Sequence, residues 1–228
     1  MQSLGDPAFW RSFYQRKQGN TFEWFVSATA AARALAPRLP RTGRILHLGC
    51  GTSRLGPLLA VKGHAVTNVD YDESCLVAAR THAAPLAAEW VAAGGACEWV
   101  QHDMRELPSS WTSRFDAVVD KGGLCAAVFA GESHAAEACR EAARCCAPNA
   151  QMHWLTDDPP EQRVELLRAA LPDFDIVGTL IDLDGDGEDG GESDLSSHER
   201  EYYIYSAQRR RTFRRERFDF SVTKGTHV

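Results

Sequence analysis

The sequence predicts an α/β domain in which a mostly parallel sheet carries helices on both faces. Three observations predict it. From residue 44 onward short apolar runs alternate with helical stretches, a glycine-rich turn follows the first of these runs, and aspartates stand where several of them end. Strands that alternate with helices form parallel sheets through right-handed crossovers. Their carboxyl ends meet at one edge of the sheet, which is where such folds bind ligands.

Residues 1–43 are expected to form a helical cap ahead of this core. Asp6 before Pro7 is typical of a helix start, because the carboxylate accepts from free N–H groups and proline needs no N–H donor there. Four aromatic residues follow at a spacing that places them on one helix face: Phe9, Trp10, Phe13 and Tyr14. A second, alanine-rich helix begins after Ser27 and ends at the prolines that follow it.

The core elements follow in alternation. We expect strands at 45–48, 65–69, 97–101, 115–120 and 151–156, and helices at about 54–62 with Ser53 as its cap, at 72–93 with an interruption near Pro85, near 132–146, and after Pro160. Two further strands, at 174–181 and 201–207, have no helix between them. They are expected to form a hairpin at one edge of the sheet.

The chain ends in two blocks of opposite charge. Asp and Glu residues crowd 182–194, and arginines crowd 209–217, within a net charge of −6. Such blocks are usually solvated segments. We therefore expect one domain over 1–208, made of the cap at 1–43 and a core at 44–208 with an acidic loop at 182–198, followed by a basic tail at 209–228. The alternative is a docking role for the tail.

Composition excludes several classes of protein. No apolar run approaches the roughly 20 residues that a membrane helix needs. The seven cysteines are an odd number without a C-x-x-C pair, which suits reduced thiols and offers no zinc site. We therefore expect no metal, no membrane association and a cytoplasmic location, with a mitochondrial one open if a transit peptide has been removed.

The first chemical signal is the turn Gly49-Cys50-Gly51 at the end of the first strand. Glycines there allow positive φ and close approach of a ligand, and the next helix offers free N–H groups. Asp70 ends the following strand about 20 residues on, where a carboxylate accepts from ribose hydroxyls. Arg54 occupies the place of the third small residue of a nicotinamide site, which argues against a dehydrogenase.

Two further strand ends carry aspartates. Asp103 follows the third strand and can accept from an adenine amino group while Met104 lies against the ring, or it can cap the next turn. Asp120 ends the fourth strand at the carboxyl edge of the sheet.

Four runs of this sequence, taken in order, resemble the class I S-adenosylmethionine-dependent methyltransferases: ILHLGCGTS, VDYDES, VQHDMREL and FDAVVDKGG. The likeness covers about residues 5–208. More narrowly, FEWF, DKGG, TDDPPEQR and YYIYSAQ are similar to a group of methyltransferase-like protein-lysine enzymes, which act on translation elongation factor 1-alpha or citrate synthase. Gly123 and Cys125 depart from the Thr and Asp of that narrower pattern.

This resemblance implies a Rossmann-like, seven-stranded sheet whose last strand is antiparallel, with S-adenosylmethionine as cofactor and S-adenosylhomocysteine as product. It implies that Gly49 and Gly51 approach the methionine part, Asp70 the ribose, and Asp120 the methionine ammonium or the entering substrate. The cofactor-binding residues so implied are Trp10, Tyr14, Phe25, Gly49, Cys50, Gly51, Asp70, Tyr71, Asp103, Met104 and Asp120.

The function expected is methyl transfer to a lysine side chain of a protein substrate. The lysine must first lose a proton, so a nearby carboxylate or a water-poor channel must help. The carboxylates expected there are Glu23, Asp120 and Asp157. Trp24 and Lys121 are expected to line the substrate channel, and Trp24 with Phe25 to hold the ammonium by cation–π contact, unless the two rings are core residues.

Two other functions stay open. One is methylation of a small molecule, and the other is a non-catalytic, cofactor-binding partner protein. A nucleic-acid substrate is disfavoured, because the net charge is acidic and no N/D-P-P-Y/F/W run follows the fourth strand. The arginine-rich tail is the feature that speaks for nucleic acid.

Overall fold

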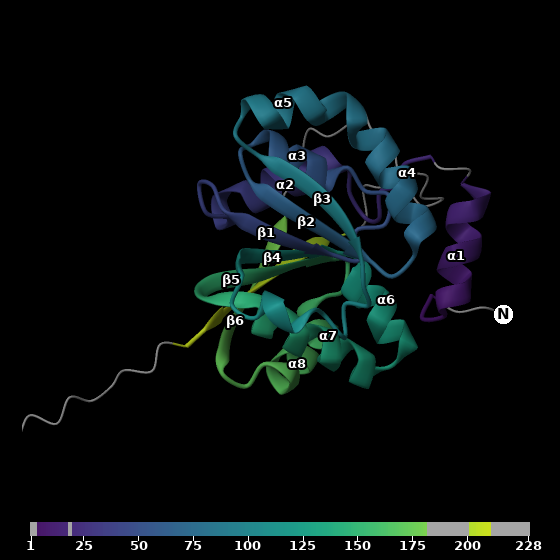
Figure 1. Ribbon diagram of the computed structural model, residues 1–228. Helices are drawn as coiled ribbons and strands as arrows, with labels where there is room; N and C mark the ends of the chain where they lie inside the picture. The colour runs from purple at the N-terminus through teal and green to yellow at the C-terminus, as the bar shows by residue number, and fades with distance from the viewer. Residues whose placement is uncertain (1–3, 18–19, 182–200, 211–228) are drawn as a thin grey trace, which may run out of the picture.

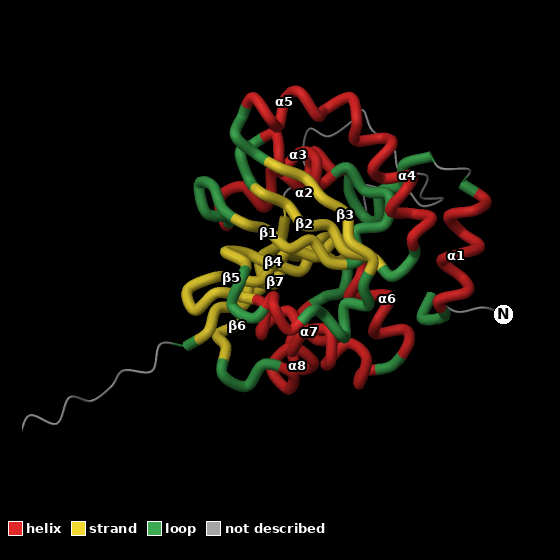
Figure 2. Tube along the Cα trace, in the orientation of Figure 1, coloured by secondary structure: helices red, strands yellow, loops and turns green. Residues whose placement is uncertain are grey.

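The structure is a computed structural model that describes residues 4–17, 20–181 and 201–210. The acidic loop expected at 182–198 and the basic tail beyond Arg210 lie outside the described residues. The described chain forms a seven-stranded sheet in the order β3-β2-β1-β4-β5-β7-β6. Helices α2, α3, α4 and α5 cover one face of this sheet, and α6, α7 and α8 cover the other (Figures 1 and 2). The expected α/β fold with helices on both faces is confirmed.

The strands are β1 Arg44–Leu48, β2 Ala65–Asp70, β3 Ala96–Gln101, β4 Phe115–Lys121, β5 Cys146–Thr156, β6 Phe174–Ile181 and β7 Tyr202–Arg209. Neighbouring strands from β3 to β5 pair in parallel. β7 lies between β5 and β6 and runs antiparallel to both. The expected hairpin at one edge, with an antiparallel last strand, is therefore confirmed.

The α-helices are α1 Pro7–Arg16, α2 Ala28–Leu35, α3 Leu55–Val61, α4 Glu73–Ala83, α5 Ala87–Ala92, α6 Gly123–Ala130, α7 Glu132–Cys145 and α8 Pro160–Ala170. Among the residues described here, none of these helices has the length and apolar character needed to cross a membrane. Apolar side chains pack on both faces of the sheet, in one cluster beneath α6, α7 and α8 and a second beneath α2, α3 and α5.

Helix caps follow the residues that the sequence indicated. The Asp6 carboxylate accepts from the N–H of Ala8 at 2.8 Å, and the Ser27 hydroxyl accepts from the N–H of Ala30 at 3.1 Å. Ser53 differs in detail, because α3 begins one residue later than expected, with Arg54 at its cap position. The Ser53 hydroxyl still accepts from the N–H of Leu55 at 3.2 Å.

Helix α6 was missed by the sequence reading. Its residues are almost uniformly apolar, so they show no helical alternation of polar and apolar side chains. The helix forms because Gly122 adopts φ 95°, which turns the chain sharply after β4. β5 is also five residues longer at its start than expected, and its pairing with β4 is irregular between Phe115 and Ala117.

Candidate functional site

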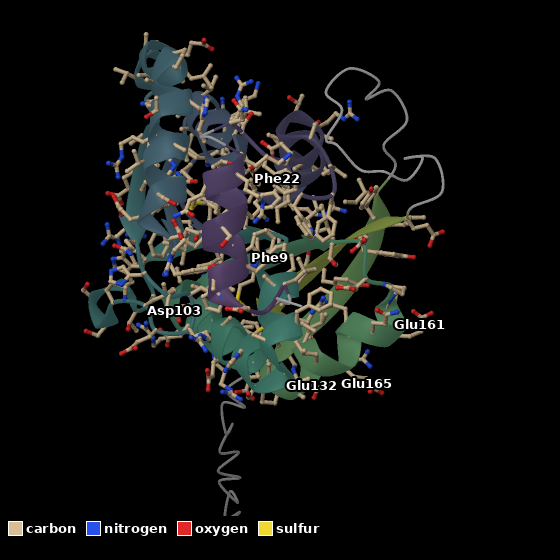
Figure 3. The ribbon with its side chains drawn as sticks, turned by 90° about the vertical axis from the view of Figure 1, so that its right-hand side faces the viewer. Phe9, Phe22, Asp103, Glu132, Glu161 and Glu165 are labelled. Atoms are coloured by element: carbon tan, nitrogen blue, oxygen red, sulfur yellow. The ribbon has the colours of Figure 1, made fainter. Side chains whose placement is uncertain are left out.

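A cavity of about 250 Å³ lies at the carboxyl edge of the sheet, where the chain leaves the paired strands β1 and β4 toward opposite faces. The turn after β1, the ends of β2, β3 and β4, and helix α6 supply its walls. Helix α1 crosses in front of this edge, and Figure 3 looks onto it, with Phe9 and Phe22 near the centre and Asp103 to one side. Among the described residues no cluster of His, Cys, Asp or Glu could hold a metal ion.

The glycine turn lines the cavity in a conformation that requires glycine. Gly49 and Gly51 have φ values of 55° and 50°. A Cβ atom on Gly51 would lie 2.3 Å from the Tyr14 hydroxyl, and one on Gly49 would lie 2.7 Å from the Cα of Gly123. Cys50 completes the turn by donating its N–H to the Val69 carbonyl at 2.9 Å. Bare backbone therefore faces the cavity here, as close approach of a ligand requires.

Asp70 lies at the end of β2, and its side chain points toward the glycine turn that follows β1. Its Oδ2 accepts from the N–H of Gly51 at 2.9 Å and its Oδ1 accepts from the N–H of Asp72 at 3.1 Å. Burial raises the pKa of this carboxyl group above its usual value. Each oxygen keeps acceptor capacity, so the carboxylate can receive hydroxyl donors of a sugar. Tyr71 lines the cavity beside it.

Asp103 and Met104 line the cavity where β3 ends. Both oxygens of Asp103 accept from the Arg105 guanidinium, at 2.5 to 3.0 Å, and Oδ1 also accepts from the N–H of Arg105 at 2.9 Å. The hydrogen bonds from Arg105 hold the pKa of Asp103 below its usual value. The hydrogen bond from the Arg105 N–H is the turn cap that the sequence also allowed for Asp103. An adenine amino group would have to share the Asp103 carboxylate with the Arg105 guanidinium.

Three aromatic rings line one part of the cavity: Trp10 from α1, and Phe22 and Trp24 from the loop after it. The ring centroids of Trp10 and Trp24 are 5.2 Å apart, and those of Phe22 and Trp24 are 5.7 Å apart. The Trp24 ring rests on Gly122, where a Cβ atom would lie 2.8 Å from it. We call these three residues the aromatic wall.

Lys121 lines the cavity beside the aromatic wall. Its ammonium group contacts Glu23 Oε2 at 2.8 Å and donates to the Trp24 carbonyl at 3.0 Å, with only 1% of the side chain exposed. Glu23 also accepts from the Ser53 hydroxyl at 2.7 Å and from the N–H of Arg54 at 2.8 Å. Glu23 therefore lies directly behind Lys121 and ties the loop to β4, but it is not itself among the residues that line the cavity.

Asp120 also lies outside the cavity surface. It is 2% exposed and stands behind Gly49 and Gly123, where a Cβ atom on Gly123 would meet its Oδ2 at 2.6 Å. Oδ2 accepts from the N–H of Leu124 at 2.9 Å, which starts α6, and Oδ1 has no hydrogen-bond partner among the described residues. Burial raises its pKa to about 7. Direct contact with an acceptor is thus not what the structure shows for Asp120.

Two other expected residues do not reach the cavity. Asp157 follows β5 and is not among the residues that line it. Phe25 adopts φ 68°, and its ring turns toward Tyr202, with centroids 6.3 Å apart. The ring also packs edge-on against Trp24, with centroids 5.7 Å apart, so Phe25 supports Trp24 without lining the cavity itself.

The sequence reading also missed residues that line the cavity. The polar ones are Thr52, Ser53, His102, Arg105 and His134. His102 stands directly before Asp103, so its place after β3 was a usable signal. His134 lies on α7 and reaches the cavity only through the packing of α6 against α7, which leaves no mark in the local sequence.

The site fits an adenosyl cofactor. The glycine turn presents bare backbone, and the buried Asp70 carboxylate is held by two backbone N–H groups. The apolar side chain of Met104 lines the cavity next to Asp103. These groups suit, in turn, a close backbone approach, ribose hydroxyls and an adenine ring.

Comparisons with known proteins agree with this geometry. The sequence matches the family described as "Methyltransferase domain" over residues 45–149. It is 38% identical over 81 residues to the putative methyltransferase YqeM of Bacillus subtilis, a match over 36% of this chain and 29% of that one. It is 24% identical over 195 residues to the mitochondrial citrate synthase-lysine N-methyltransferase CSKMT of Danio rerio, covering 78% and 77%. It is 32% identical over 126 residues to EEF1A lysine methyltransferase 4 of Mus musculus, covering 54% and 46%.

The chain thus spans less than half the length of two of these three relatives. Solved structures resemble it in fold. A TehB-like SAM-dependent methyltransferase from Corynebacterium glutamicum has a TM-score of 0.58 at 18% identity, covering 90% of this chain and 100% of that one. The glycopeptide N-methyltransferase MtfA, solved with S-adenosylmethionine, has 0.62 at 17%, covering 83% and 97%. The [4+2]-cyclase SpnF has 0.57 at 18%, covering 83% and 87%.

The sheet order, the glycine turn with Asp70 and the family match lead to one assignment. Residues 45–149 match the methyltransferase-domain family, the fold is the Rossmann-like fold of S-adenosylmethionine-dependent methyltransferases, and S-adenosylmethionine is the cofactor that this site accommodates.

Proposed function

We propose that this chain transfers a methyl group from S-adenosylmethionine to a lysine side chain of a protein substrate. One observation carries the proposal: the aromatic wall lines the same cavity as the glycine turn and Asp70. Aromatic faces attract an ammonium group by cation–π contact, and they also exclude water. Two relatives named as lysine methyltransferases, one of citrate synthase and one of EEF1A, support the choice of acceptor.

The bound cofactor supplies a methyl group that is already activated, so the residues of the chain mainly position and desolvate. Trp10, Phe22 and Trp24 take water away from the entering amine, which lowers the pKa of a lysine and favours its nucleophilic form. Glu23 neutralises the buried Lys121 ammonium, so that a second cation can approach. With Glu23, Asp120 and Asp157 away from the cavity surface, the proton leaves through desolvation and solvent near the mouth rather than to one of these carboxylates.

Methylation of a small molecule is the second candidate. Helix α1 and Leu4 close part of the cavity, as a capped pocket for a small acceptor requires, and MtfA is a neighbour that methylates a glycopeptide. The cyclase SpnF shares the fold as well. Because a protein named as a cyclase has the same fold, the fold alone does not establish methyl transfer. The experiment below therefore also tests the non-catalytic alternative.

The test uses cofactor with a labelled methyl group and extracts from cells that lack this protein, prepared separately from cytosol and mitochondria. Labelling of one protein band, followed by acid hydrolysis to methyl-lysine, supports the proposal. Label in the small-molecule fraction supports the second candidate, and label in RNA contradicts both. Gly51→Val is the matched control, because it removes the glycine turn that the cofactor needs. Cofactor binding without transfer in any fraction would identify a non-catalytic binding protein.

A further inference from the structure

A buried arginine, Arg163, lies outside the cofactor cavity and is not among the residues that line it. Arg163 is the last residue of the TDDPPEQR run and lies on α8 with 2% of its surface exposed. One nitrogen, Nη2, contacts Asp158 Oδ2 and lies 3.5 Å from the Cys125 sulfur. Its Nε and Nη1 have no hydrogen-bond partner within the described part of the chain. A guanidinium group this deeply buried is costly unless its charge is used.

The contacts of Arg163 are held rigidly. The Thr156 hydroxyl donates to Asp158 Oδ2 at 2.9 Å, and the Asp158 N–H donates back to that hydroxyl at 3.0 Å. The Tyr205 hydroxyl donates to the Asp158 carbonyl at 2.8 Å. β5, β7 and α8 thus fix the guanidinium in one place. This network lies on the side of α6 where Cys125 is buried, one residue after Leu124.

Asp120 stands between this network and the cavity. Its Oδ2 accepts from the Leu124 N–H, and Cys125, the next residue, contacts Arg163. Its Oδ1 is buried without a partner in the described residues. On the other side Gly49 and Gly123 lie between the carboxylate and the cavity, and neither has a side chain to screen it. We call these two residues the glycine window.

We propose that Arg163 is a positioning residue for cofactor binding, which keeps the buried Asp120 ionised behind the glycine window without touching the cofactor. The cofactor carries a sulfonium and an ammonium group, so a buried anion one residue layer away attracts it strongly in a low-dielectric surrounding. The ionised carboxylate is also the better acceptor for the Leu124 N–H, which holds the turn that contains Gly123.

The charges around Asp120 agree with this role. Burial raises its pKa to about 7, whereas the positive charges of Arg163 and Lys121 oppose that rise. The thiols of Cys125 on α6 and Cys139 on α7 also interact with Asp120, and burial raises their pKa values to about 11 and about 12. Asp158, the ion-pair partner of Arg163, is the acidic group of the same network. Both thiols are neutral near pH 7. Arg163 and Lys121 are then the cations that set the charge of Asp120.

The test is the dissociation constant of S-adenosylmethionine, measured by calorimetry from about pH 6 to about pH 8.5, which spans the pKa of Asp120. Asp120→Asn serves as the reference, because it keeps the titration of the cofactor's own amino group and removes that of Asp120. In the unmodified protein we expect affinity to weaken as the pH falls through about 7, relative to Asp120→Asn. Arg163→Met should move that midpoint up by about one pH unit and weaken binding at pH 7 about fivefold.

Two variants separate charge from structure. Arg163→Lys keeps the positive charge and should keep the midpoint of the unmodified protein, and Arg168→Met on the exposed side of α8 should change nothing. If Arg163→Met fails to fold, Arg163→Gln keeps a hydrogen-bonding group beside Asp158, removes only the positive charge and should show the raised midpoint. A profile that does not differ from that of Asp120→Asn, or a midpoint that stays unchanged without the arginine, would overturn the proposal. Because only cofactor binding is measured, the result is independent of the acceptor.

Discussion

The buried ion pair between Glu23 and Lys121 should contribute measurably to the free energy of unfolding. The Lys121 side chain is 1% exposed and that of Glu23 is 17% exposed, with 2.8 Å between the ammonium nitrogen and Oε2. Glu23→Gln removes the countercharge and leaves Lys121 with the Trp24 carbonyl. Breaking a buried pair in this way costs about 3–5 kcal/mol, and we take about 3 kcal/mol because Glu23 is only partly buried.

Lys121→Met should cost less. Glu23 keeps its hydrogen bonds from the Ser53 hydroxyl and the Arg54 N–H, so its charge stays solvated by two donors. We expect about 2 kcal/mol for this variant. The double variant has no unpaired charge, and we expect it to lose about 3 kcal/mol rather than about 5, which gives a coupling energy of about 2 kcal/mol.

Urea unfolding of the four proteins measures this cycle. A loss of about 3 kcal/mol should lower the melting temperature by about 6–12 °C in a chain of this size. Asp116→Asn is the matched control, since the Arg44–Asp116 pair is exposed at 52% and 36% and should change stability by about 1 kcal/mol at most. If the single effects add to within about 0.5 kcal/mol, the two groups are not coupled and the reasoning is refuted.

Three further predictions concern the cofactor and pH. Gly51→Ala should weaken S-adenosylmethionine binding at least tenfold, because φ is 50° and the new Cβ would lie 2.3 Å from the Tyr14 hydroxyl; adding Tyr14→Phe should restore part of the affinity, and a single variant that binds normally in calorimetry would contradict the site. Asp70→Asn should fold, because its amide oxygen still accepts from Gly51, but should bind about 10- to 100-fold more weakly; unchanged binding would remove Asp70 from the ribose site. Asp120 has a pKa raised to about 7 from 3.8, so the folded protein favours its protonated form. The stability that this group contributes is fully present below about pH 4 and is lost as the pH rises through 7. Unfolding of Asp120→Asn should therefore show a gain over the unmodified protein that grows by as much as about 4 kcal/mol between those values, about 1.4 kcal/mol for each pH unit of the shift; a difference that does not vary with pH would contradict the burial argument.

Local signals predicted most of the fold. Asp6 and Ser27 mark helix starts through hydrogen bonds to residues two or three positions away, so sequence alone could place them. Parallel strands buried on both faces are continuous apolar runs, and β1 and β4 were predicted to within a residue. Helix α6 shows the limit, since a helix that packs apolar residues on several sides loses the periodicity on which the prediction depends.

The site was predictable where a residue type and a strand end coincide, as at Asp70 and the glycine turn. It was not predictable where partners come from distant segments. Glu23 binds Lys121, which lies 98 positions further along the chain, and that pairing turns a candidate acidic group into a tie between a loop and a strand. Asp120 ends the strand that was expected, but the glycine window places it behind the cavity wall instead of in it.

Helix α1 has a further consequence for turnover. None of its residues is fully buried, yet Trp10 and Tyr14 line the cavity and the helix lies across its front (Figure 3). An element with so little buried surface opens at low free-energy cost compared with the sheet beneath it. We therefore expect spent cofactor to leave through local opening of the amino-terminal helix, so that the rate of this opening sets an upper limit on how often the enzyme can complete a cycle.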